Sequence, residues 1–270
     1  MAQININHCK DDGFNCLYNA DLITEEMVRE LLKDEAAQLY SEKEQMLAFG
    51  NEARYKLTVN GELWFAKELK NKYWYSSIKN IFFSTDCWKA FQIGCKLVSY
   101  DINTPQPILA ATVICGEETK QLLITRFIEN AKGLADHVTS IKDQEHGRER
   151  VLDRVARTLA EFHKDGFCFK HINSTSIIVS NNDDKINFWY TALEAIGSNR
   201  FHFNTAFINT VAQACKDFHK NIHDEERIIF LRVCFDAALK NNIFKRPSQQ
   251  EWFIKKTNQR VSELLNESTN

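Results

Sequence analysis

The sequence predicts an α+β protein in two parts, a strand-rich first part and a mostly helical second part. Two apolar strands flank Asn60-Gly61, which is a strong hairpin signal. A long amphipathic helix follows over 148–165, and helical patterns dominate from there to the end of the chain. Strands first and helices later, with one strand pair between helices, is typical of a two-lobed α+β arrangement.

We expect three segments along the chain. Residues 1–49 would form an N-terminal leader and helix, residues 50–130 a strand-rich lobe, and residues 131–270 a helical lobe. No internal repeat or low-complexity stretch interrupts them.

The composition is that of a folded protein without a strong electrostatic bias. Of 270 residues, 44% are hydrophobic and 26% charged, and the formal net charge is −2. This balance gives no general attraction to nucleic acid or to an anionic membrane. With 19 Phe, 7 Tyr and 5 Trp, the chain has too much aromatic surface to remain disordered.

The cysteines and the N-terminus favour a reduced, cytoplasmic protein. No CxxC pair suggests a zinc site, and the N-terminus lacks the pattern of a signal peptide. No apolar run reaches the roughly 18 residues that a membrane span needs. Six of the eight cysteines lie singly in apolar runs, where a thiol acts as a small core residue: Cys87, Cys95, Cys115, Cys168, Cys215 and Cys234.

The first half alternates between helix and strand patterns. Residues 1–20 read as an irregular or short-strand leader, and helical periodicity then runs from Leu22 to Met46. Residues 54–67 form the hairpin, followed by a helix over 85–100 and two strands. These strands cover Ile108–Cys115 and Gln121–Phe127.

The second half is organised by its helices. The helix over 148–165 buries one stripe of apolar residues and ends at Gly166 as a C-cap. Two short strands follow, on either side of a turn at 181–184. The remaining helices are expected over 204–220, 224–240 and 248–266.

A hairpin that ends in apolar-Ala-Lys is a place to look for a nucleotide-binding lysine. Protein kinases carry such a lysine on their third strand, where it contacts the α- and β-phosphates of ATP. Lys67, at the end of Leu63-Trp-Phe-Ala-Lys67, fits this position.

Further motifs, in order, give the chain a resemblance to the bacterial lipopolysaccharide kinase family, which contains the heptose and Kdo sugar kinases. The resemblance runs from Gly50 to Cys234 and implies a protein-kinase-like fold. Besides Lys67, the segments that carry it are Tyr100–Ile108, Leu122–Glu129, Thr158–Phe167 and Glu226–Arg232.

At the positions matched to the family's catalytic residues, this chain departs from the pattern. The loop histidine is replaced by Phe169, and the catalytic aspartate by His171. Ser176 and Tyr190 stand where the two metal-binding residues are expected. Asn204 replaces the acid that braces the catalytic loop, and Ala192 replaces a second aspartate.

These replacements remove the chemistry on which phosphoryl transfer depends. Mg²⁺ neutralises the phosphates and prefers carboxylate, carbonyl and water oxygens. A tyrosine with a reference pKa of about 10 and a serine hydroxyl make a poor site for it. His171 has the basicity of a proton acceptor, yet no metal would activate the phosphoryl group.

We therefore expect a pseudokinase with no intact catalytic residue and no metal site, acting as a binding or regulatory module. An active ATP-dependent kinase of a lipopolysaccharide core sugar is the alternative, and it would need acids from elsewhere, with Asp165, Asp183 and Asp184 as the candidates. A nucleotide-binding sensor that uses Lys67 for ATP without catalysis is the third. Asp183 and Asp184 are also ordinary turn residues.

The resemblance also bears on partner and location. It implies work near lipopolysaccharide or cell-envelope polysaccharide assembly, on the cytoplasmic side of the inner membrane, with a protein as partner. The segment 243–270 contains Lys245-Arg246-Pro247 and could dock a partner or a membrane surface, although the sequence favours an ordinary solvated closing helix.

Overall fold

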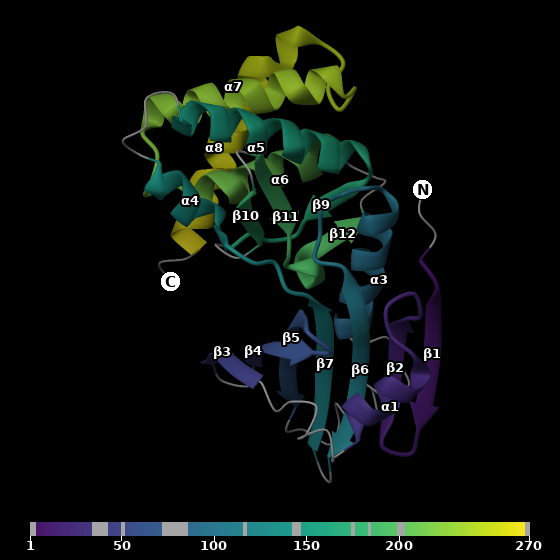
Figure 1. The fold of residues 1–270 in the computed structure, drawn as a ribbon. Helices are drawn as coiled ribbons and strands as arrows, with labels where there is room; N and C mark the ends of the chain where they lie inside the picture. Colours follow the sequence, from purple (N-terminus) through teal and green to yellow (C-terminus); the bar gives the residue numbers. More distant parts are fainter. Residues whose placement is uncertain are drawn as a thin grey trace. The chain divides into compact units, whose positions relative to one another are not determined.

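The computed structural model describes residues 4–33, 43–49, 52–71, 86–115, 118–141, 147–173, 176–182, 185–198 and 203–267. The chain divides into two compact units, Met1–Glu129 and Asn130–Asn270. Figure 1 shows the long strands gathered in the first unit and helices α4–α8 in the second. The α+β fold class is confirmed, and each unit is described by itself below.

The first unit is built on one antiparallel sheet of seven strands, in the order β1-β2-β6-β7-β5-β4-β3. Its strands are β1 (Ile6–Asp11), β2 (Phe14–Asn19), β3 (Lys43–Phe49), β4 (Glu52–Val59), β5 (Glu62–Asn71), β6 (Pro107–Cys115) and β7 (Glu118–Arg126). Its helices are α1 (Glu25–Leu32) and α3 (Asp86–Ser99).

The N-terminal residues are part of this sheet rather than a separate leader. Strands β1 and β2 pair as a hairpin, and β2 continues onto β6. Phe14, Cys16 and Tyr18 are buried at alternate positions of β2, which is the period of a strand packed on one face. Of the two alternatives expected over residues 1–20, an irregular or a short-strand leader, the structure therefore has the strands.

The helix predicted from Leu22 to Met46 is correct only over α1. Thr24 caps α1 by accepting a hydrogen bond from the amide of Met27 at 3.3 Å. Met46 lies instead on edge strand β3, which pairs along β4. Its side chain is exposed, so its place in a helical pattern was accidental. Leu39 lies outside the described residues.

The hairpin predicted at Asn60-Gly61 is confirmed. Both residues have positive φ, 53° and 80°, as required by a two-residue turn whose twist matches that of the flanking strands. Strands β4 and β5 then pair without a shift from Val59↔Glu62 to Glu52↔Leu69. This register places Lys67 opposite Arg54 on β4 and opposite Leu123 on β7.

Both faces of the central strands are covered. Residues 107–112 of β6 and 121–125 of β7 are all buried, without the alternation of a half-exposed sheet. Val28, Leu31 and Leu32 of α1 join one core cluster on this sheet. Helix α3 also packs on β6 and β7, and the Cys87 thiol reaches the carbonyl oxygen of Ala111 at 3.6 Å.

The second unit is mainly helical, with the predicted helices present within a few residues. Its helices are α4 (Leu134–Ser140), α5 (Gly147–Lys164), α6 (Phe203–Asp217), α7 (Asp224–Lys240) and α8 (Gln250–Glu267). Its strands are β8 (Ala131–Gly133), β9 (Phe167–Phe169), β10 (Ile177–Asn182), β11 (Lys185–Tyr190) and β12 (Ile196–Ser198). Gly166 follows α5 with φ of 86°, as predicted for a C-cap.

An ion pair joins the long helices α5 and α7. The Nη1 atom of Arg148 lies 2.9 and 3.0 Å from the two carboxylate oxygens of Glu226. Glu226 also accepts a hydrogen bond from the backbone amide of His223, which caps α7. The segment Glu226–Arg232 therefore begins in the first turn of α7.

Buried aromatic rings form the core between α6, α7 and α8. Phe253 packs against Phe207, Phe235 and Phe244, with ring centroids 5.4–6.0 Å apart. The cysteines predicted as core residues are buried and form no disulfide wherever their side chains are described. None of the helices in the described parts of the chain is long and apolar enough to cross a membrane.

Replacing Phe253 by Ala should lower the free energy of unfolding by about 3–5 kcal/mol, because three rings lose their partner and a cavity remains. The neighbouring change Trp252→Ala is the control, since that side chain is 45% exposed, and should cost roughly 1 kcal/mol or less. Urea unfolding curves measure both; equal losses would contradict this packing.

Candidate functional site

Lys67 is held by an acid on the neighbouring strand. Its Nζ lies 3.3 Å from Oε2 of Glu52, and its side chain is only 15% exposed. Glu52 also accepts a hydrogen bond from Nε of Arg54 at 2.6 Å. One carboxylate on β4 thus joins two cations that stand opposite each other in the sheet.

Helix α3 was the other place to look for an acidic partner of Lys67. Its first residue, Asp86, pairs instead with Lys89 of the same helix at 3.4 Å. The sequence carries a signal for Glu52. Arg54 is the partner of Lys67 in the hairpin register, and Glu52 lies two residues before Arg54 on the same strand. That diagonal relation becomes visible once the turn at Asn60-Gly61 fixes the pairing.

The surroundings of Glu52 favour its ionised form. Burial alone would raise the pKa of its carboxyl, but the hydrogen bond from Arg54 and the charge of Lys67 outweigh that effect, so the pKa lies below its usual value. The carboxylate is therefore charged near neutral pH, and it fixes Lys67 in a partly enclosed position.

In the second unit, the position matched to the kinase loop histidine is part of an aromatic core. Phe169, at the end of β9, is 1% exposed. Its ring centroid lies 5.2 Å from that of Phe162 on α5 and 5.7 Å from that of Tyr190 on β11. The rings of Phe162 and Tyr190 stack at 4.3 Å.

Tyr190 is turned into this core rather than toward solvent. The side chain is 2% exposed, and its hydroxyl donates a hydrogen bond to the carbonyl oxygen of Thr158 at 3.2 Å. Burial raises the pKa of the phenol, so that it stays protonated. A neutral phenol that is already bonded to a helix carbonyl is a poor ligand for a hard cation.

Ser176 stabilises the loop that precedes β10 by hydrogen bonds to Asn173. Its hydroxyl accepts a hydrogen bond from the amide of Asn173 at 2.9 Å and donates one to Oδ1 of the same residue at 3.0 Å. The side chain is fully buried. The hydroxyl therefore acts as both acceptor and donor toward Asn173.

The loop backbone is anchored by two side chains of α6 that were not predicted. Oγ1 of Thr210 accepts a hydrogen bond from the amide of Phe169 at 3.3 Å. Oε1 of Gln213 accepts a longer one from Ile172 at 3.5 Å. Both side chains are buried. Asn204 lies at the start of α6, beside the α7–α8 connection, and the sequence offered only its aligned position as a guide.

His171 is exposed, as are Lys170 and Asn173, whereas Ile172 beside it is buried. The Cys168 thiol is buried and lies 3.6 Å from the carbonyl oxygen of Gly197, and burial raises its pKa. Within the described ranges, no group of three or more His, Cys, Asp or Glu side chains is placed to hold a metal ion. Asp165 is half-buried after α5, whereas Asp183 and Asp184 lie outside the described residues.

Restoring an acid at position 190 should damage the fold. Tyr190→Asp places a carboxylate among stacked rings and should cost about 3 kcal/mol or more of unfolding free energy. Tyr190→Phe keeps the ring and removes the hydroxyl that bonds to Thr158, at a cost of about 0.5–1.5 kcal/mol. Denaturant unfolding measures both, and a Tyr190→Asp protein as stable as the wild type would show that the ring is not part of the core.

Glu52, Arg54 and Lys67 form what we call the Glu52 cluster. This cluster should make the free energy of unfolding depend on pH. Because the folded-state pKa of Glu52 is lowered, its contribution is complete above the unfolded value of about 4.3 and is lost as the pH falls through the folded value. The stability difference between wild type and Glu52→Gln should therefore shrink from about pH 6 to about pH 3.

Glu44→Gln is the control for this pH series. The exposed Glu44 carboxylate lies 3.8 Å from Lys56 on the same sheet, and its loss should change stability little at either pH. A Glu52→Gln difference that stays constant with pH would contradict the role given to the cluster.

The comparisons with known proteins bear on the family and the fold of this chain. The family model described as "Lipopolysaccharide kinase (Kdo/WaaP) family" matches residues 29–195. The solved structure described as "WaaP in complex with acyl carrier protein" is similar in fold, with a TM-score of 0.55 at 12% sequence identity, over 88% of this chain and 98% of that one. No protein with a curated description matches. Since the family model spans more than half of the sequence, the chain belongs to the lipopolysaccharide kinase (Kdo/WaaP) family.

Proposed function

We propose that this member of the family is a pseudokinase, which keeps the kinase-like fold and acts as a binding or regulatory module instead of transferring phosphate. The observation that carries the proposal is Tyr190, whose phenol is buried in an aromatic stack and bonded to Thr158. It stands at the position matched to a metal-binding aspartate. A metal-assisted reaction has no ligand there.

The other matched positions support the same conclusion. Phe169 belongs to the same stack, and Ser176 uses its hydroxyl to close the turn with Asn173. Phe169, Ser176 and Tyr190 are therefore part of the internal structure, and their side chains are already engaged within the protein. His171 is exposed and could accept a proton, but general-base catalysis without metal leaves the phosphate charge unneutralised.

Nucleotide binding is a separate matter from catalysis. Lys67 keeps the place and the partly enclosed setting of a phosphate-contacting lysine, and Glu52 fixes its direction. An ammonium in this position can contact phosphate oxygens without a metal. Any ATP binding would on this proposal depend on Lys67 and not on Mg²⁺.

The partner we propose is a protein of envelope or lipopolysaccharide assembly, met at the cytoplasmic face of the inner membrane. Family membership supports the pathway. The similar solved structure is of WaaP in complex with an acyl carrier protein, which supports a protein partner as the kind of ligand. A module without turnover would act by such binding.

A thermal-shift titration with ATP tests the proposal. Mg²⁺ or Mn²⁺ should not increase any shift, because Tyr190 and Ser176 are unavailable as ligands. A ligand present at a hundred times its Kd stabilises a protein by about 2.7 kcal/mol, which this measurement detects. Lys67→Ala should remove any shift that occurs, and Lys89→Ala, an exposed lysine on α3, should keep it.

The same titration can overturn the proposal. A shift that requires the metal and disappears in Lys67→Ala would instead support the active kinase, and phosphorylation of a lipopolysaccharide core sugar would establish it.

A further inference from the structure

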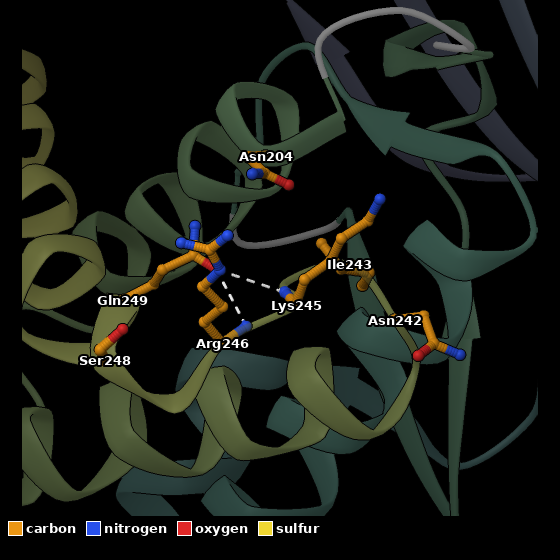
Figure 2. Close-up of a pocket in the computed structure, with 7 residues that line it drawn as sticks. All are labelled: Asn204, Asn242, Ile243, Lys245, Arg246, Ser248 and Gln249. Atoms are coloured by element: carbon orange, nitrogen blue, oxygen red, sulfur yellow. Dashed lines mark hydrogen bonds between the residues drawn. The ribbon is translucent and has the colours of Figure 1, made fainter.

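A cavity in the second unit brings together basic and amide side chains that the proposed function does not use. It has a volume of about 470 Å³, within the range of about 300–1,000 Å³ that small-molecule sites occupy. It lies between the start of α6 and the connection from α7 to α8 (Figure 2). Its lining residues are Asn204, Asn242, Ile243, Lys245, Arg246, Ser248 and Gln249.

The backbone that carries the two cations is fixed from several sides. Asn242, just after the end of α7, has φ of 60°, and the amide of Ile243 donates a hydrogen bond back to the carbonyl oxygen of Ala238 at 2.9 Å. Ile243 and Phe244 are buried behind it. A ligand would meet a segment that is already ordered, which lowers the entropy cost of binding.

Gln249 holds the next stretch of this segment. Its Oε1 accepts hydrogen bonds from the backbone amides of Lys245 at 3.3 Å and Arg246 at 3.1 Å. Figure 2 shows these bonds and the two basic side chains extending on the side of Asn204. Their charged groups are thus left for other contacts.

The charge of the cavity is one-sided. No acidic side chain is among the seven lining residues, and within the described parts of the chain neither Lys245 nor Arg246 forms an ion pair. Arg157, an exposed arginine on α5, by contrast pairs with Asp153 at 2.8 Å. Two adjacent cations without a counter-charge favour an anion, and the planar guanidinium suits phosphate oxygens.

The remaining lining groups indicate what the anion is attached to. The cavity is also lined by two carboxamides and one hydroxyl, from Asn204, Asn242 and Ser248. Each of these groups can donate and accept hydrogen bonds, which suits a ligand that carries hydroxyl groups. The volume exceeds what one phosphate group needs. We propose that this cavity binds the phosphate of a phosphorylated polyol, either as a free molecule or as the head group of a lipid.

The test compares wild type with two double variants that lose equal charge. Lys245→Gln/Arg246→Gln removes the cations of the cavity, and Lys255→Gln/Lys256→Gln removes two exposed lysines farther along α8. All four side chains are exposed, so the three proteins should unfold at the same temperature. Glycerol 3-phosphate is titrated by calorimetry, with glycerol as the uncharged comparison.

The second arm measures sedimentation with phosphatidylcholine vesicles that contain or lack phosphatidylglycerol. We expect wild type to bind in at least one arm, the cavity variant to bind at least about tenfold more weakly, and the α8 variant to match wild type. The arm in which binding occurs identifies the free or the lipid-borne phosphate. Absence of binding in both arms, or equal loss in both variants, overturns the proposal.

Discussion

The rings of Phe162 and Tyr190 stack with their centroids 4.3 Å apart. The proposed loss of metal binding in the second unit depends on this contact. It draws the end of β11 toward α5 and takes Phe169 into the same core. An aspartate at position 190 would need water or a cation, whereas the phenol needs only one carbonyl, which Thr158 supplies. On the proposal that this protein is a pseudokinase, an apolar core stands in place of a metal site, and the loop beside it is secured by bonds within the protein.

The fold was largely predictable because its signals are local. The Asn60-Gly61 turn, the apolar stripe of α5 and the Gly166 cap each depend on residues close in sequence, and each is present in the structure. The exceptions are residues whose structure depends on distant strands. Met46 fits a helical period yet belongs to β3, because pairing with β4 outweighs a periodicity that rests on few residues.

The identity of the candidate site residues stays a prediction from the sequence, and their arrangement could not be predicted from it. The sequence locates Lys67, His171, Ser176 and Tyr190 by their order, and it cannot say which way a side chain turns. The hydrogen bonds from Phe169 to Thr210 and from Ile172 to Gln213 span 41 residues each, and no local pattern announces them. Glu52 lies between these cases, since the hairpin register brings it near Lys67.

The central claim, that the lost metal ligands have become internal structure, is tested most directly by the electron paramagnetic resonance of Mn²⁺ with a non-hydrolysable ATP analogue. Free Mn²⁺ gives a sharp signal that falls when the ion is bound. If Tyr190 and Ser176 use their hydroxyls for hydrogen bonds with Thr158 and Asn173, they do not bind Mn²⁺. The Mn²⁺ signal measured with the nucleotide alone should then not change when the protein is added. A further, protein-dependent loss of signal that Lys67→Ala abolishes would contradict the claim.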